Sequence, residues 1–211
     1  MRWWPPNLRN EAEMEAYMYF DRNIRGLPKK PDGSIDTLSP GFVDNDVDAF
    51  RHAYVSGVFA REYSENIANI FGVMNEWSSS ASPAGGANMD LWNNAVGRKL
   101  GLKASNNQDL LELVKKALTE GELIISLDDP RKFTGPLPTI PSGHNSVIVL
   151  KEDGRGVNEY FYDFATSRVI TRVEFVSEIT QGRYPGYAVR RVNGVDYPLS
   201  KRDKDPSNNL G

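Results

Sequence analysis

Cysteine is absent from the 211-residue chain, and histidine occurs only twice. The absence of cysteine excludes disulfide bonds, thiolate metal sites and a cysteine nucleophile. It also suits a protein that works outside the cytoplasm, without requiring one. No apolar run approaches the roughly 18 residues that a membrane span needs, and residues 1–10 lack the apolar stretch of a cleavable signal peptide. We therefore expect no transmembrane segment.

A marked excess of charge of one sign is also lacking. The chain has 25 Lys and Arg residues against 28 Asp and Glu residues, and its formal net charge is −3. Because nucleic-acid binding usually needs a basic surface, this composition does not favour a nucleic acid as partner. The hydrophobic fraction of 39% and the charged fraction of 25% are typical of a globular protein.

The hydrophobic periodicity is helical in the first part of the chain. Residues 1–10 are predicted to form an extended arm, with a helix prevented by Pro5 and Pro6, and with Trp3 and Trp4 packed against the body. Four helices are predicted after the arm. They cover 10–26, then about 44–77 with Asp44 or Asp46 as the capping residue and a break near Gly72, then 88–101 and 107–121.

Beyond residue 121 the pattern becomes strand-like. Residues 146–150 and 159–164 are predicted to pair as a hairpin, and Asn193-Gly194 predicts a tight turn between 187–192 and 195–199. The predicted fold class is α+β, with a mainly helical N-terminal two-thirds followed by small antiparallel β-hairpins. We expect a single domain over 1–200, helical at about 10–121 and β-hairpin at about 123–199, and a disordered tail over 201–211.

The stretch "VDAFRHAYVSG" (47–57) contains the first candidate site. Asp48 and His52 are four residues apart and share one helix face. His52 is then a candidate general base, with Asp48 fixing its tautomer and Arg51 beside them for substrate binding. The alternative is a structural pair, in which a carboxylate near the helix start is favoured by the helix dipole.

The stretch "NMDLWNNAVGR" (88–98) places Asp90, Asn93 and Asn94 at positions i, i+3 and i+4. Asparagine competes for backbone hydrogen bonds and is unfavourable inside a helix, so another requirement placed two of them there. They either satisfy a core network or bind a ligand. We favour ligand binding, because positions that break local rules cluster at functional sites.

Glu76 lies where the second predicted helix ends, beside Trp77. In a partly apolar pocket its pKa would be raised, as a general acid requires. The alternative is an ordinary exposed glutamate at a helix end.

His144 precedes one predicted strand and Asp163 ends its partner, which resembles the arrangement in papain- and transglutaminase-like hydrolases. Those enzymes need a nucleophile at a helix N-terminus, and Ala87-Asn88 supplies none, so a purely structural hairpin is the alternative. Asp44, Asp48, His52 and Asp90 could converge on a metal ion. The sequence has no HExxH, EF-hand or Cys/His motif, however, and we assign no metal and no cofactor.

Three segments, "DAFRHAYVSG", "MDLWNNAVGRKLG" and "LVKKALTEGELIISL", resemble a bacterial domain family of unknown function. That family occurs in secreted, YD-repeat and wall-associated proteins, often as a toxin-like C-terminal tip. The resemblance covers roughly residues 40–127 and departs at Asn75, where the family pattern has histidine before glutamate. The positions carried over from the family pattern are Asp48, Arg51, His52, Glu76, Asp90, Asn93 and Asn94.

The resemblance implies a toxin-like context, and the residues indicate acid–base hydrolysis. We therefore expect a secreted antibacterial effector that hydrolyses a cell-envelope polymer, preferably peptidoglycan. In a glycosidase mechanism Glu76 is the general acid and Asp90 or Asp48 the second carboxylate. The expected catalytic residues are Asp48, His52, Glu76 and Asp90, and the expected substrate-binding residues are Arg51, Asn75, Asn93, Asn94 and His144.

Such an effector is expected to be secreted or delivered into the periplasm of a target cell without a cleavable signal, and to have a cognate immunity protein as partner. Three rival functions stay open from sequence. They are a phospholipase that uses His52 with an aspartate, a metal-dependent nuclease, and a non-catalytic binding or structural module.

Overall fold

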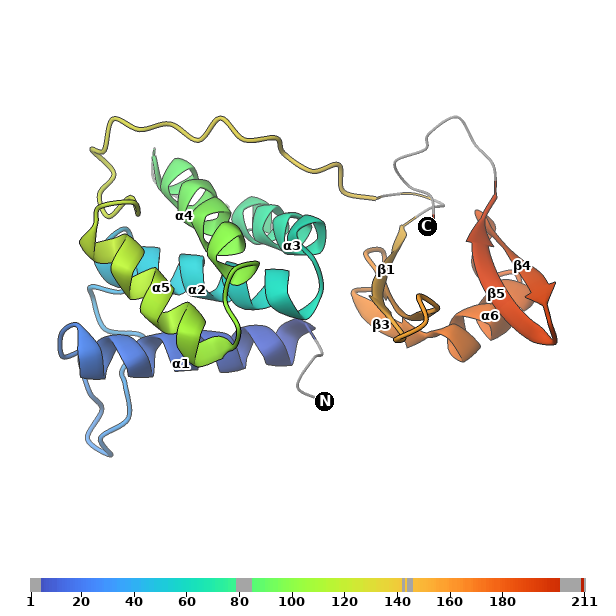
Figure 1. Cartoon of the computed structure of the whole chain (residues 1–211), viewed down its shortest axis with the longest axis horizontal. Coiled ribbons are helices and arrows are strands. Elements are labelled where there is room, and N and C mark those ends of the chain that lie inside the picture. The colour runs from blue at the N-terminus through green and yellow to red at the C-terminus, as the bar shows by residue number, and fades with distance from the viewer. Residues whose placement is uncertain (1–4, 79–84, 142, 144–145, 202–209, 211) are drawn as a thin grey trace. The chain divides into compact units, whose positions relative to one another are not determined.

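The computed structural model describes residues 5–78, 85–141, 143, 146–201 and 210. Over these residues it contains six helices and two small antiparallel sheets of three and two strands, which confirms the predicted α+β class. The chain divides into two compact units, Met1–Pro138 and Thr139–Gly211 (Figure 1). None of the described helices is long and apolar enough to cross a membrane.

The N-terminal unit is helical. Its elements are α1 (Pro5–Asn23), α2 (Asp46–Glu62), α3 (Glu65–Ser78), α4 (Gly86–Gly101) and α5 (Asn107–Thr119). The central helix is α2, which packs against the other four (Figure 1). Its buried side chains include Phe50, Ala53 and Tyr54, none of which is exposed to solvent.

The α2–α4 contact is unusually close because glycines line it. A Cβ atom added to Gly101 would lie 2.2 Å from the carbonyl oxygen of Gly57, a distance that no side chain tolerates. The two helix backbones therefore touch directly, and any side chain on the facing surfaces of α2 and α4 is brought close to the other helix.

The predicted start of the first helix and the predicted break in the second were wrong. Helix α1 begins at Pro5, because a proline in the first turn of a helix gives up no hydrogen bond. The predicted arm is therefore not observed at residues 5–10, and the predicted packing of Trp3 and Trp4 lies outside the described residues.

The predicted long second helix is divided into α2 and α3 by Tyr63 and Ser64 rather than near Gly72. The Ser64 hydroxyl accepts a hydrogen bond from the backbone N–H of Ile67 at 3.2 Å and so helps to start α3. The residue that caps α2 is Asn45, whose side chain accepts from the first backbone N–H groups, rather than either neighbouring aspartate. The predictions for the next two helices agree with α4 and α5 to within two residues.

The C-terminal unit contains both predicted hairpins and two elements that the sequence analysis missed. Strands β1 (Val147–Glu152), β2 (Asn158–Asp163) and β3 (Arg168–Thr171) form an antiparallel sheet in that order, and β4 (Tyr187–Val192) pairs with β5 (Val195–Ser200). The missed elements are β3 and helix α6 (Arg172–Thr180). The predicted turn at Asn193-Gly194 is confirmed, with φ angles of 49° and 81°.

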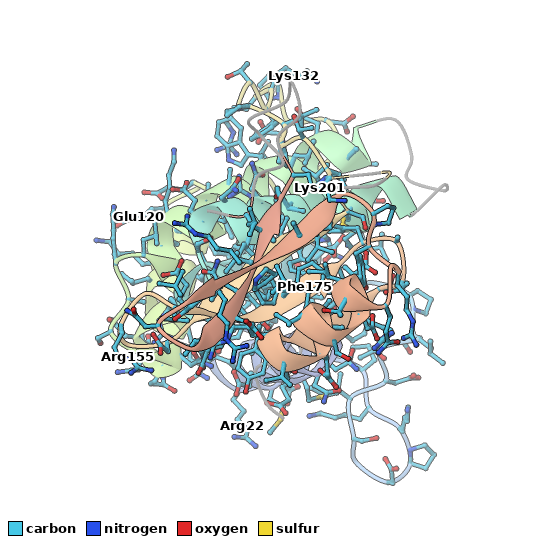
Figure 2. The ribbon with its side chains drawn as sticks, turned by 90° about the vertical axis from the view of Figure 1, so that its right-hand side faces the viewer. Arg22, Glu120, Lys132, Arg155, Phe175 and Lys201 are labelled. Atoms are coloured by element: carbon cyan, nitrogen blue, oxygen red, sulfur yellow. The ribbon has the colours of Figure 1, made fainter. Side chains whose placement is uncertain are left out.

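Helix α6 holds this unit's own core together. It starts with a capping box in which Thr171 and Glu174 exchange side-chain and backbone hydrogen bonds. The buried ring of Phe175, which Figure 2 labels, contacts Phe161 from β2 and Tyr187 from β4. The predicted disorder at 202–209 and 211 lies outside the described residues.

Candidate functional site

Five of the predicted site residues come together between α2 and α4. Asp48, Arg51 and His52 project from α2, and Asp90 and Asn94 from α4. The four-residue spacing of Asp48 and His52 on α2 repeats for Asp90 and Asn94 on α4, so each pair lies on one helix face. The cluster is buried, with only 2% of Asp48, 6% of His52 and 7% of Asp90 exposed.

The carboxylate of Asp48 is fixed through both oxygens. Its Oδ2 accepts a hydrogen bond from the backbone N–H of Asp44 at 2.8 Å. Asp44 has a φ of 56°, in the left-handed region, and this backbone conformation aims its N–H back toward the first turn of α2. The other oxygen, Oδ1, accepts from Nη2 of Arg51 at 2.5 Å and faces the centre of the cluster.

The hydrogen bonds of His52 determine its tautomer. Nη2 of Arg51 lies 2.7 Å from Nε2, and because a guanidinium only donates, Nε2 must accept. The ring proton is then on Nδ1, which donates to Oδ1 of Asn94 at 3.3 Å. His52 is therefore a neutral imidazole whose Nε2 lone pair is directed into the cluster.

Charge in the cluster is distributed unequally. Burial, followed by the positive charge of Arg51, lowers the pKa of His52 to about 3. Burial also disfavours the charge of Arg51, but the carboxylate of Asp48 contributes to a net rise in the Arg51 pKa. The second amino group of Arg51, Nη1, reaches Glu13 of α1 at 3.3 Å. Arg51 is thus the permanent cation of the site.

Asp90 brings a second carboxylate to the imidazole. Its Oδ1 lies 3.3 Å from Nε2 of His52, and Oδ1 of Asp48 lies 3.5 Å from the same nitrogen. One ligand-type atom from each of the three residues lies within 4.8 Å of the others. One imidazole and two carboxylates can exchange protons with a bound molecule or coordinate a cation.

Asn93 faces another way. Its amide nitrogen donates to the carbonyl oxygen of Ile124 at 2.8 Å, and its amide oxygen accepts from the backbone N–H of Ile124 at 2.9 Å. The side chain is completely buried. Asn93 of α4 therefore anchors the segment that follows α5. This geometry favours a structural role for Asn93, and its predicted contact with substrate is untested.

The remaining predicted residues lie on other elements or outside the described residues. Glu76 belongs to α3, but its side chain lies outside the described residues, as does the whole of His144. Asn75 is half-buried on α3. Asp163 accepts hydrogen bonds from Ser146, Thr166 and Tyr184, which fits the structural alternative for that hairpin.

Two contributors to the site were missed from sequence. Glu13 contacts Arg51 from a helix 38 residues away, and the backbone of Asp44 supports Asp48. Asp44 was considered only as a helix cap or a metal ligand, whereas its contribution here is a backbone N–H. No local sequence signal links Glu13 to Arg51, because the contact depends on how α1 packs against α2.

Residues 39–122 match the model of a domain of unknown function (DUF6973). The matched segment contains α2 to α5 and with them every residue of the cluster except Glu13. The match is consistent with the resemblance to a domain family of unknown function. Comparison with curated proteins and with solved structures gives no match.

Proposed function

We propose that the N-terminal unit is a hydrolase whose reaction takes place at the Asp48–His52–Asp90 cluster. The observation that carries the proposal is the convergence of these three buried side chains and the half-buried Arg51 on two touching helices. Burying ionisable groups costs free energy that a pair of apolar side chains would not, and perturbed ionisable groups are concentrated at catalytic sites. A His–Asp–Asp cluster with a neutral imidazole supports acid–base chemistry.

The roles of the residues follow from their hydrogen bonds. Nε2 of His52 has the lone pair and accepts a proton from water once Arg51 turns its amino group to the substrate. Asn94 is a positioning residue, because it holds the ring proton on Nδ1. Asp48 and Asp90 stabilise the positive charge that develops on the ring, and Arg51 binds an oxygen atom of the substrate.

The substrate in this proposal is peptidoglycan, and the chain acts as a secreted antibacterial effector. The support for that context is the resemblance of the α2, α4 and α5 segments to toxin-like tips of bacterial surface proteins. The net charge of −3 gives no electrostatic support for a nucleic-acid substrate. Asparagine, arginine and carboxylate side chains match the amides and hydroxyls of a peptidoglycan strand.

The test is growth of a bacterial host that produces the full chain, once in the cytoplasm and once exported to the periplasm. We expect lysis only on export, and release of soluble fragments when purified protein is added to peptidoglycan sacculi. His52→Ala should abolish both effects. Asp128→Asn is the matched control, because Asp128 is an exposed aspartate of the same unit, outside the cluster.

Killing from the cytoplasm would reject the envelope as the site of action. If the exported wild-type chain leaves cells and sacculi intact, the cluster is a structural network between α2 and α4, and the hydrolase proposal is wrong. Thermal unfolding of His52→Ala must accompany the assay, so that loss of activity is not confused with loss of fold.

A further inference from the structure

We propose that Asp48, His52 and Asp90 form a binding site for one divalent transition-metal ion, of the Zn²⁺ or Mn²⁺ type, and that Arg51 competes with the ion for the two α2 ligands. The inference concerns the same cluster as the proposed hydrolase, but while the ion is bound Nε2 of His52 is its ligand and accepts no proton. It is tested by binding alone, however, so the two proposals can fail separately.

The spacing of the three ligand atoms fits one ion. A tetrahedral ion with bonds of about 2.0–2.1 Å to nitrogen and oxygen holds its ligand atoms roughly 3.3–3.4 Å apart. In the structure Nε2 of His52 lies 3.3 Å from Oδ1 of Asp90 and 3.5 Å from Oδ1 of Asp48. One ligand-type atom of each residue lies within 4.8 Å of the other two, so a small rotation of one carboxylate completes the set.

The presentation of the imidazole is a second and independent indication. A metal-binding histidine is neutral and usually donates its other ring N–H to an oxygen, which fixes the tautomer and aims the free lone pair at the ion. Nδ1 of His52 donates to Oδ1 of Asn94, and this leaves Nε2 facing the two carboxylates. In a simple Asp–His dyad the ring N–H would point at a carboxylate instead.

The position of Arg51 shows that a cation is stable at this point. Its Nη2 bridges Oδ1 of Asp48 and Nε2 of His52 at 2.5 and 2.7 Å, which are two of the three proposed ligand atoms. The same guanidinium already contacts Glu13 through Nη1 at 3.3 Å. Arg51 can therefore turn toward α1 and keep a carboxylate partner while an ion takes its place.

The ligand set also limits the choice of ion. Two carboxylate oxygens and one imidazole suit Zn²⁺ or Mn²⁺, whereas Ca²⁺ and Mg²⁺ prefer oxygen ligands alone. Three protein ligands leave at least one coordination position open for water or substrate, as in catalytic rather than structural zinc sites.

The first experiment is calorimetric titration of the full-length, chelator-treated protein with ZnCl₂ and MnCl₂, with MgCl₂ and CaCl₂ as comparators. We expect one ion per chain and at least tenfold weaker binding of Mg²⁺ and Ca²⁺. X-ray absorption at the zinc edge should show one imidazole, with oxygen for the other ligands. Failure of wild type and Arg51→Gln to bind either transition metal saturably would overturn the proposal, and so would a spectrum with two imidazoles.

Variants locate the ion. His52→Gln should weaken Zn²⁺ binding at least 100-fold. His144→Gln, which removes the second of the two histidines of the chain, should leave Zn²⁺ binding within a factor of two. Arg51→Gln should bind Zn²⁺ at least fivefold more tightly, because a competing cation is gone. Tighter binding is an outcome that a merely destabilised protein does not produce, and weaker binding in Arg51→Gln would reject the competition.

Discussion

Gly97 of α4 lies against Ala53 of α2 so closely that a Cβ atom on the glycine would fall 1.9 Å from the alanine carbonyl oxygen. That oxygen belongs to the backbone of α2, in the middle of the helix, so it cannot move aside easily. We therefore expect Gly97→Ala to lower the free energy of unfolding by about 3 kcal/mol or more, as severe overpacking does. Denaturant unfolding followed by tryptophan fluorescence measures this.

Gly26→Ala is the matched control for that experiment, because no heavy atom lies within 4 Å of a Cβ at Gly26. It should change the free energy of unfolding by less than about 1 kcal/mol. Equal effects of the two substitutions would mean that α2 and α4 are not in backbone contact.

Asn93→Ala tests the division between structural and substrate-binding asparagines. The substitution leaves the buried N–H and C=O of Ile124 without their partners, and each such group costs about 1–3 kcal/mol. We expect a loss of about 2–5 kcal/mol in thermal or denaturant unfolding. A variant of normal stability that no longer releases fragments from sacculi would instead assign Asn93 to the substrate.

Asn94→Ala should weaken metal binding rather than destabilise the fold. Loss of a hydrogen-bond partner of a metal-bound histidine typically weakens metal binding 10–100-fold. We expect a loss of that size in Zn²⁺ affinity by calorimetry, with thermal unfolding showing a folded protein. Unchanged Zn²⁺ affinity would show that Asn94 does not position His52.

The C-terminal unit should lose stability in acid because of Asp163. Burial opposes its charge, but hydrogen bonds from Ser146, Thr166, Tyr184 and the backbone of Ala165 prevail and lower the pKa of Asp163 below 3.8. A carboxylate whose pKa is lower in the folded state than in the unfolded state stabilises the fold. This contribution is complete at pH values above the unfolded-state pKa, and it is lost as the pH falls from there toward the folded-state pKa.

Denaturant unfolding at pH 7, 5, 4 and 3, followed by the NMR signals of β2, measures that loss. Asp163→Asn should be less stable at pH 7 and should show a smaller decline between pH 5 and pH 3. If wild type and Asp163→Asn decline equally, another carboxylate is responsible. Tryptophan fluorescence would not report on this unit, because all four tryptophans precede residue 139.

Elements with strong local signals were predictable from sequence. Asn193-Gly194 specifies its turn by needing two positive φ angles, and the "NQDLLELVKKAL" stretch specifies α5 by its apolar period. Helix α6 was missed although "TRVE" is a capping-box pattern, because only Phe175 of that helix is buried and the apolar period is too weak to detect.

The cluster residues on α2 and α4 were predictable, but their hydrogen bonds were not. Spacing alone placed Asp48 with His52 and Asp90 with Asn94, since four residues make one helical turn. The tautomer of His52 depends on Arg51 and Asn94 together, and the second of these is 42 residues away. The sequence analysis paired His52 with a carboxylate, whereas in the structure the ring N–H of His52 donates to the side-chain amide oxygen of Asn94. That difference leaves Nε2 of His52 facing both carboxylates, and both proposals depend on this atom.

The close contacts at the glycines also determine the spacing of the polar cluster. Asp90 and Asn94 lie one to three turns before Gly97 and Gly101 on the same rod-like helix, and Asp48 and His52 likewise precede Gly57 on α2. Because a helix is stiff over so few turns, a methyl group inserted at the crossing would act as a wedge and spread the carboxylates several residues away. Glycines that contribute no side chain to the cluster thus set the distances between its charged and polar groups.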